Sequence, residues 1–452
     1  MSKKAQFATK IGLVAATVGS AVGLGNVWRF PAETQSNGGA AFLLLYVGCV
    51  LLLGIPVMLA EFSLGRAGRS DAIGVFRRLS PGKAWWLVGA LAILTSYLIL
   101  SYYMVVAGWT LEYLFETLSG GLYSDARGAG SGVVFAGKMA DFISSDTEPL
   151  VFTVLVIALN AAILIAGVQK GIERLSNVLM PLLFLILLAL CAVTLRLPGA
   201  ADGLEFFLAP DFSKITPAVF INALGQAFFS LSLGMGILVT YAAYYPSHTK
   251  LGRTAGIVSL MSLLVAVLMG LVIFPAVKTF GLDRESLEGT TLVFVTLPEV
   301  FSRLPLSELW SALFFVLLFV AAVTSTVSIA EVSVSCLQDR FGMSRRKAVL
   351  VSLTPLLLFS ALNSLSFGSL SEFRIMGMTI FEFLDNFTTN VLLPVVAMGV
   401  CVYMGWFSPR GLLARELGNY GSHRSRVTGA VLFIIRYVAP LLIALIMISN
   451  FV

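Results

Sequence analysis

A succession of long apolar segments limits what this chain can fold into more than any other feature. Hydrophobic residues make up 58% of the 452 residues, charged residues only 12%, and the mean hydropathy is +0.92. This balance excludes a soluble domain, and the length excludes a single membrane anchor. A helix needs about 20 mostly apolar residues to cross a bilayer, with its backbone polar groups bonded internally. We therefore expect an all-α polytopic membrane protein.

Windows of this length predict eleven transmembrane helices in a single transmembrane domain over residues 1–452. The expected spans are 9–35, 39–64, 84–117, 150–168, 172–197, 216–245, 253–278, 303–338, 346–366, 373–406 and 427–450. The longest polar stretches, 118–149, 198–215 and 279–302, are expected to be loops, with or without short surface helices.

Basic residues indicate how these helices are oriented. With the N-terminus inside, 20 of the 30 Lys and Arg residues fall in inner segments, 8 in outer segments, and 2, Arg29 and Arg436, within spans. Lys and Arg in short loops stay on the cytoplasmic side. We therefore expect a cytoplasmic N-terminus and an extracytoplasmic C-terminus. The formal net charge of +6 follows from this topology and requires no nucleic-acid partner.

Residue types suited to enzyme chemistry are few and scattered. The cysteines fall in apolar spans without paired spacing, which favours packing over a disulfide or a metal site. They are Cys49, Cys191, Cys336 and Cys401. His248 and His423 fall in expected inner loops without a ligand cluster or a catalytic partner. We assign no catalytic residue and do not expect an enzyme.

Two of the expected spans are interrupted by residues that break helices. "GSAVGLGNVWRFP" (19–31) lies in the first span and "FFSLSLGMG" (228–236) in the sixth. Because the two breaks stand five spans apart and five is odd, a five-span repeat enters the membrane from the opposite side the second time. This predicts a 5+5 inverted repeat with discontinuous helices 1 and 6. Its parts are a first repeat at about 9–197, a second at about 216–406, and an additional helix at 427–450.

A broken helix offers two kinds of binding group at once. Its free carbonyls can face a cation, while the N–H groups at the start of the next half-helix face an anion. "AAVTSTVS" (321–328) in the eighth span adds the hydroxyls of Thr324 and Ser325, and hard oxygen ligands suit an alkali cation. The pattern thus predicts a site shared by a carboxylate and sodium. In the alternative interpretation, the glycines only let helices pack closely and the hydroxyls bond back to their own helix.

Ordered motifs then give a resemblance that runs from about residue 5 to residue 450. They are "AVGLGNVWRFP", "NGGAAF", "GIPVMLAEFSLGR", "GIERLSNVLMP", "FFSLSLGMG", "VTSTVSIAE" and "IRYVAPLLIAL". The set resembles the neurotransmitter:sodium symporter family, in particular its bacterial amino-acid transporters with the leucine-transporter-like fold. The chain ends after an eleventh span, whereas the commoner pattern in the family has twelve.

The resemblance implies two sodium sites. Site one would use the carbonyl of Ala21, the side chain of Asn26, the hydroxyl of Ser230 and, where an amide or carboxylate is usual, Ser262. Site two would use the carbonyls of Gly19, Val22 and Ala321 with the hydroxyls of Thr324 and Ser325. Chloride is a further candidate ion. Its implied ligands are Tyr46, Gln226 and Ser230, although Ala266 stands where the family usually has a serine or a glutamate.

The resemblance also implies a substrate pocket. Its residues would be Ser20, Ala21, Gly23, Gly25, Ile99, Tyr103, Phe229, Ser230, Ser232, Met235, Ser325 and Ile329. Monoamine carriers of the family have an aspartate at the position of Gly23, so a glycine there implies a substrate that brings its own carboxylate. Ile99, Met235 and Ile329 would form an apolar subpocket.

Charged and aromatic residues match the two gates of the family. Arg29 and Asp385 would close the outer path over Phe229 and Tyr103. Lys4, Tyr244 and Asp339 would close the inner path. Glu61 and Glu331, also within spans, are expected to hydrogen-bond neighbouring helices and receive no transport role.

Together these features imply a sodium-coupled secondary symporter that imports hydrophobic, aliphatic or aromatic, L-amino acids by alternating access. The expected ligands are the amino acid and sodium, two ions by the family pattern, and the expected surroundings are the lipid bilayer of the cell inner (plasma) membrane. Two alternatives stay open, a proton-coupled amino-acid carrier of the same general fold and a membrane-bound amino-acid sensor. No oligomeric state is predicted.

Overall fold

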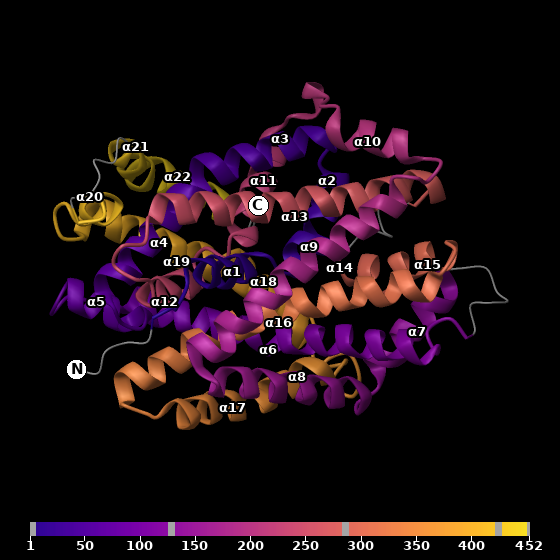
Figure 1. Ribbon diagram of the computed structural model, residues 1–452, viewed down its shortest axis with the longest axis horizontal. Coiled ribbons are helices and arrows are strands. Elements are labelled where there is room, and N and C mark those ends of the chain that lie inside the picture. The colour runs from indigo at the N-terminus through magenta and orange to yellow at the C-terminus, as the bar shows by residue number, and fades with distance from the viewer. Residues whose placement is uncertain (1–5, 125–131, 283–288, 421–426, 450–452) are drawn as a thin grey trace.

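The computed structural model describes residues 6–124, 132–282, 289–420 and 427–449, and their regular structure is helical (Figure 1). Within these ranges the only strand-like pairing is an isolated antiparallel bridge between Ile375 and Met378. The expected all-α class is therefore confirmed.

The helices follow the expected apolar segments. The α-helices are α1 (Lys10–Ala21), α2 (Phe30–Ser36), α3 (Ala40–Cys49), α4 (Ile55–Gly68), α5 (Ala72–Leu79), α6 (Trp86–Ser119), α7 (Gly132–Ser144), α8 (Glu148–Ile165), α9 (Arg174–Thr194), α10 (Ala200–Leu208), α11 (Pro217–Ser230), α12 (Ile237–Ala243), α13 (Leu251–Phe280), α14 (Gly289–Thr291), α15 (Leu297–Ser302), α16 (Ser307–Phe341), α17 (Arg345–Leu365), α18 (Ile380–Phe387), α19 (Leu393–Val402), α20 (Leu412–Leu417), α21 (Thr428–Phe433) and α22 (Ala439–Ser449).

Short π-helical segments join several of these helices. They are Gly25–Arg29, Val50–Gly54, Val168–Glu173, Leu292–Thr296, Thr388–Leu392, Tyr403–Phe407 and Ile434–Val438, and one 3₁₀ turn covers Phe212–Lys214. A π segment widens the helix locally without breaking it, and such segments are frequent at functional sites.

Nine helices in the described ranges are long and apolar enough to cross a membrane. A bent pair, Lys10–Ala21 with Gly25–Ser36, makes a tenth span with an angle of 57° at its break. The expected sixth span consists of two short helices, α11 and α12, each below the length of a crossing helix. The count of eleven stays a prediction, because it requires these two halves to act as one span.

The expected tenth span begins later than the sequence indicated. Helix α18 starts at Ile380 rather than near residue 373. Thr379 caps this start, because its hydroxyl accepts the N–H of Glu382 while the Glu382 carboxylate accepts the N–H of Thr379. Such a capping box marks a helix start, and the turns before it include Gly377 at φ +82°.

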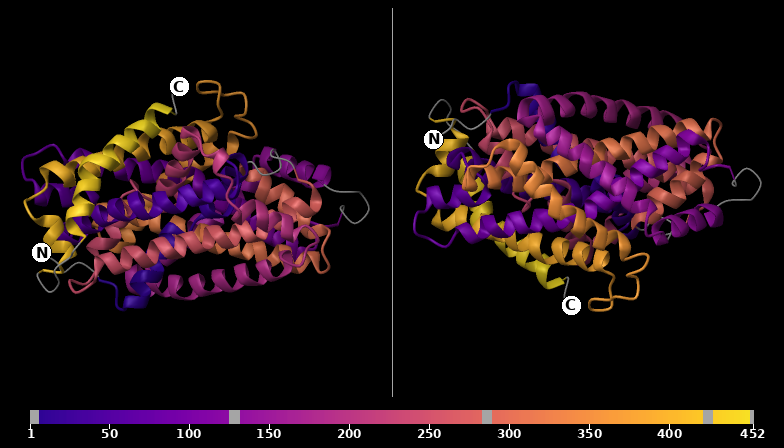
Figure 2. Two further views of the ribbon diagram at one scale, coloured as in Figure 1. Left: turned by 90° about the horizontal axis from the view of Figure 1, so that it is seen from above. Right: turned by 90° about the horizontal axis from the view of Figure 1, so that it is seen from below.

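Burial separates the centre of the bundle from its rim. In the most apolar stretch of α16, 78% of the residues are buried, against 28% in the span Thr428–Ser449. Helices α6 and α16, the two longest, lie together through the middle of the bundle (Figure 1). Helix α22 runs obliquely over its outside (Figure 2). The apolar side chains left on such outer helices suit contact with lipid.

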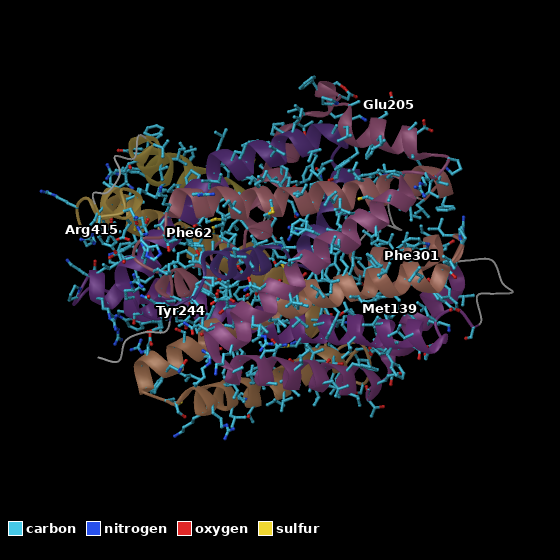
Figure 3. The ribbon with its side chains drawn as sticks, in the orientation of Figure 1. Phe62, Met139, Glu205, Tyr244, Phe301 and Arg415 are labelled. Carbon is cyan, nitrogen blue, oxygen red and sulfur yellow. The ribbon has the colours of Figure 1, made fainter. Side chains whose placement is uncertain are left out.

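The bundle has two distinct ends. Tyr244 and Arg415 lie at the end that also carries α5 and α20, whereas Met139, Glu205 and Phe301 lie toward the other (Figure 3). We call the first of these the α5 end. It carries the loops in which most basic residues of the expected inner segments fall.

Helices α4 and α12 approach so closely that only glycine fits at the contact. A Cβ atom at Gly65 would lie 2.0 Å from the carbonyl oxygen of Val239 and 2.9 Å from the Cβ of Ala242. Gly48, in the same span Ala40–Gly68, has open space where its Cβ would be. The position of α12, one half of the broken sixth span, therefore depends on Gly65.

We expect Gly65→Ala to lower the thermal stability of the purified protein by about 1–3 kcal/mol, because overpacking forces the two backbones apart. Gly48→Ala is the matched control, and it should leave stability unchanged or raise it by up to about 1 kcal/mol, since alanine is the better helix former. Thermal unfolding in detergent measures both. Equal melting temperatures for the two variants would contradict the contact.

Candidate functional site

The first break lies between α1 and the π segment Gly25–Arg29. Helix α1 ends at Ala21, and Val22 adopts an extended conformation. The N–H of Leu24 donates a hydrogen bond of 3.0 Å to the hydroxyl of Tyr103 on α6. A side chain from another helix therefore bonds a main-chain group that the break has freed, as a helix interrupted at bilayer depth requires.

The second break separates α11 from α12 over residues 231–236. Ser232, Gly234 and Gly236 have φ of +53°, +80° and +71°, which a continuous helix does not permit. The N–H of Gly234 donates to Glu61 Oε1 at 2.8 Å, and the hydroxyl of Ser232 donates to the carbonyl of Ser20 at 2.7 Å. The two breaks are thus hydrogen-bonded to each other. Glu61, expected to hydrogen-bond a neighbouring helix, holds the second one.

A cavity of about 270 Å³ lies at the two breaks, and all twelve expected pocket residues line it. Other lining residues escaped the sequence reasoning: Leu24, Trp28, Tyr102, Val106, Gly289, Thr290 and Phe381. Three of them had a signal, since Leu24 and Trp28 stand inside the first quoted motif and Tyr102 precedes Tyr103. Phe381 had none, because it reaches the cavity from α18 through the tertiary fold alone.

The cavity wall is mostly apolar or uncharged. Arg29 and Asp385 are the only charged residues among its lining residues in the described ranges. A ligand inside it therefore meets hydroxyls, main-chain groups and apolar side chains.

The expected ligands of sodium site one lie close together. Asn26 Nδ2 donates to Ser262 Oγ at 3.0 Å, and Ser262 Oγ donates to the carbonyl of Ser230 at 3.1 Å. Asn26 is fully buried, yet its Oδ1 has no hydrogen-bond partner. Burial of an unpartnered amide oxygen is costly, and a cation beside it would remove that cost. The donor set therefore fits a sodium ion, with Ala21 lining the same cavity.

The expected ligands of sodium site two face one another across α1 and α16. Ser325 Oγ donates to the carbonyl of Gly19 at 3.4 Å. Thr324 Oγ1 donates to the carbonyls of Val320 and Ala321 at 3.0 and 3.2 Å. A Cβ atom at Gly19 would lie 3.2 Å from Thr324 Cβ, so a glycine lets α1 come this near. Val22 is fully buried just beyond α1, at the break.

The expected chloride ligands are only partly bonded to each other. Tyr46 Oη donates to Ser230 Oγ at 2.9 Å. Gln226 turns its amide toward the first break, where Nε2 donates to the carbonyl of Gly25 at 3.2 Å and the buried Oε1 has no partner. Ala266 is fully buried and brings no polar side chain.

The expected outer pair is not joined in this structure. Arg29 pairs with Glu33 at 3.7 Å, and its guanidinium lies 4.9 Å from the centre of the Phe229 ring. Within the described residues no ion pair joins Arg29 to Asp385, although both line the cavity. The guanidinium is therefore paired with a carboxylate one turn further along the same helical segment.

The expected inner residues have other partners. Lys4 falls outside the described residues. Tyr244 donates to Glu331 Oε1 at 2.6 Å, and Glu331 pairs with Arg345 at 2.6 Å. Asp339 accepts the N–H of Asp71 at 2.7 Å. Glu331 on α16 thus joins α12 and α17, as expected of a residue that hydrogen-bonds neighbouring helices.

Comparisons with known proteins agree with this arrangement. The model of the sodium:neurotransmitter symporter family matches residues 4–125 and 138–452. An uncharacterized sodium-dependent transporter of Bacillus subtilis, YhdH, is 37% identical over 99% of this chain and 98% of its own length. An uncharacterized sodium-dependent transporter of Haemophilus influenzae is 35% identical over 98% of this chain and 97% of its own length. The solved structure of MhsT in complex with L-phenylalanine matches with a TM-score of 0.89 and 39% identity, over 99% of this chain and 100% of that one.

Two serines on α13 test the polar network around Asn26. Ser262→Ala removes the hydroxyl that joins Asn26 to Ser230, so we expect a loss of about 1–3 kcal/mol in stability. Ser259→Ala is the matched control, because the Ser259 hydroxyl is buried without a partner and its removal should be neutral or stabilising. Thermal unfolding in detergent compares them. A larger loss for Ser259→Ala would rule out the network.

Proposed function

This chain belongs to the sodium:neurotransmitter symporter family, and we propose that it imports hydrophobic L-amino acids together with sodium by alternating access. As a member, it is a sodium-dependent membrane transporter and not an enzyme. The observation that carries the proposal is the hydrogen bond between the two broken helices at a cavity that holds an unpartnered Asn26 oxygen.

An α-amino acid suits the chemistry of this cavity. Its carboxylate would lie at the N-terminal end of the half-helix that begins near Gly25, within reach of the Tyr103 hydroxyl. Its side chain would lie against Ile99, Met235 and Ile329, which is why we propose an aliphatic or aromatic one. A charged side chain would find no opposite charge there, since Arg29 and Asp385 stand at the outer path. MhsT, solved with L-phenylalanine, supports this class.

Sodium is the second cargo, and we propose two ions. Site one would take Ala21, Asn26, Ser230, Ser262 and the substrate carboxylate. The residues for site two would be Gly19, Val22, Ala321, Thr324 and Ser325. Because the carboxylate of the substrate is a ligand of one ion, each favours binding of the other. This shared contact is the physical basis of the proposed coupling.

Chloride is a further proposed ion, at Tyr46, Gln226 and Ser230. The argument is electrostatic, since two sodium charges in a low dielectric call for a negative partner, and Asp385, the proposed partner of Arg29, is the only carboxylate among the described residues that line the cavity. Transport that stays unchanged when chloride is replaced by gluconate would end this part of the proposal.

Alternating access follows from the gates. Closure of the outer path would bring Arg29 onto Asp385 above Phe229, and opening of the inner path would part the contacts of Tyr244, Asp339 and Lys4. In the present structure the Arg29–Glu33 pair leaves the outer pair apart, and the Tyr244–Glu331 bond ties the helices of the inner side.

Proteoliposome uptake tests the proposal directly. Labelled phenylalanine, leucine and glycine are offered with and without an inward sodium gradient. We expect accumulation of phenylalanine and leucine that requires sodium. Uptake driven by a proton gradient alone would indicate a proton-coupled carrier, and binding without accumulation would indicate a sensor. Either result would overturn symport with sodium.

Removal of one hydroxyl should weaken sodium binding at site two. We expect Thr324→Val to raise the sodium concentration for half-maximal uptake about tenfold or more, because an oxygen ligand is lost while the shape is kept. Thr326→Val is the matched control on the same helix, since Thr326 is also buried and bonded through Oγ1 to a carbonyl of its own helix, that of Val323, but is not among the proposed sodium ligands. Equal sodium dependence in both variants would exclude Thr324 as a ligand.

Loss of the outer guanidinium should impair transport. We expect Arg29→Ala to lower the uptake rate about tenfold or more, because truncating one partner of a partly buried charge pair costs about 2 kcal/mol or more. Arg374→Ala is the control, since Arg374 and its partner Glu382 are both half exposed and lie outside the cavity. Wild-type uptake and substrate affinity in Arg29→Ala would show that the outer pair has no such role.

A further inference from the structure

A second cavity, of about 800 Å³, lies between α1, α9 and α13. It shares no lining residue with the cavity at the two breaks. Its residues include the start of α1, the start of α13 and the loop 246–250. Two carbonyls of that loop, those of Ser247 and Thr249, bond Arg66 near the end of α4, which places the cavity at the α5 end of the bundle. We call this cavity the α1–α13 groove.

The walls of the α1–α13 groove are apolar and continue onto the outer surface. Val14, Phe184, Ile257 and Met261 line it, and Ile11 at its edge is 77% exposed. Only 39% of the most apolar stretch of Val168–Thr194, which forms one wall, is buried. In a membrane such a surface faces lipid, so a chain of hydrocarbon has direct access to the groove.

The rim of the groove is basic. Lys10, Lys250 and Arg253 line it, and no aspartate or glutamate does so among the described residues. None of these three cations has an ion-pair partner in the described part of the chain. Other cations are paired, such as Arg66 with Glu416 and Arg345 with Glu331. The rim therefore carries positive charge without a neighbouring negative charge among the described lining residues, next to the apolar walls of the α1–α13 groove.

A carboxylate near the start of α1 does not change this balance. Glu173 is buried beside α1, and its two oxygens accept the N–H groups of Ala8 and Thr9 and the hydroxyl of Thr9. It does not line the groove. Its charge is thus directed at the backbone before α1 and away from the three cations.

We propose that the α1–α13 groove binds an anionic glycerophospholipid. One acyl chain lies along Val14, Ile257 and Met261, and the phosphate lies between Lys10, Lys250 and Arg253. The combination selects this ligand, because free phosphate gains nothing from the apolar walls and a zwitterionic lipid brings no net charge to the rim. Basic side chains next to anionic headgroups contribute about fivefold each in affinity.

The lipid also affects the transport cycle, a consequence that rests on the proposed function. Helix α1 forms one wall of the groove and leads directly into the first break at Ala21. A lipid held between α1, α9 and α13 contacts α1 and therefore biases its position. It can shift α1 from one position to another only if it binds more tightly to one of the two. Anionic lipid should change the uptake rate.

Lipid binding is measured first, independently of transport. The full-length protein in detergent is titrated with palmitoyl-oleoyl phosphatidylglycerol or the matched phosphatidylcholine, and bound lipid is counted by native mass spectrometry. We expect one tight phosphatidylglycerol site. The double variant Lys250→Gln/Arg253→Gln should bind it about 30-fold more weakly. The control Arg346→Gln/Lys347→Gln removes two exposed cations at the start of α17 and should bind as wild type.

A third variant distinguishes a seated acyl chain from surface attraction. Ile257→Trp places a larger side chain in the α1–α13 groove and leaves the basic rim intact, so the affinity for phosphatidylglycerol should fall about tenfold or more. Inorganic phosphate at millimolar concentration should not compete. Sodium-dependent phenylalanine binding, kept in every variant, verifies folding and also separates failure of this inference from failure of the proposed function.

Several results would overturn the lipid site. One is equal affinity for phosphatidylglycerol and phosphatidylcholine. Another is an equal loss of lipid affinity in the control and in the rim variant, Lys250→Gln/Arg253→Gln. A third is lipid binding by Ile257→Trp as tight as by wild type. Competition by inorganic phosphate would show an anion site without a lipid. If lipid binding behaves as expected, the uptake rate of the wild type should differ about threefold between phosphatidylglycerol and phosphatidylcholine vesicles. The rim variant Lys250→Gln/Arg253→Gln should have the same uptake rate in both.

Discussion

Main-chain groups freed by a helix break at bilayer depth must find partners within the protein, because lipid supplies none. In this chain the partners come from neighbouring helices. Tyr103 bonds the N–H of Leu24 at the first break, and Glu61 bonds the N–H of Gly234 at the second. The Ser232 hydroxyl then joins the second break to the Ser20 carbonyl of the first. The cavity exists because these bonds hold both breaks open without leaving them unsatisfied.

Packing around the breaks explains why the site keeps its shape. Helix α16 is the most buried of the long helices, and it brings Thr324 and Ser325 to α1. Glycines allow the approach, since side chains at Gly19 or Gly65 would meet Thr324 or the Val239 backbone. The helices on the rim carry exposed apolar side chains instead, as lipid-facing surfaces do. A rigid centre and an apolar rim together suit a protein whose halves move against each other in a membrane.

Charge is distributed by the same logic. Among the described residues that line the cavity, only Arg29 and Asp385 are charged, and they are the two residues of the proposed outer gate. Toward the α5 end, Glu331 and Arg345 form a buried pair that also bonds Tyr244. The α1–α13 groove differs, since its cations have no carboxylate partner in the part of the chain that the structure describes. Paired charges thus connect helices, whereas the unpaired rim is suited to an external anion.

Sequence alone determined the helical class, the approximate spans, the two breaks and the polar residue types that gather at them. Hydropathy over about 20 residues and the positions of glycine, asparagine and proline are local properties, so they can be predicted from the sequence without the fold. Contacts between residues distant in the chain could not be predicted in this way. Several contacts depend on how the helices cross: those of Glu61 with Gly234, Glu331 with Tyr244, Glu33 with Arg29, and Phe381 with the cavity. The late start of α18 depends on a capping hydrogen bond. Only the tertiary structure decided these contacts, because the direction of a side chain from a helix has meaning only once the neighbouring helix is in place.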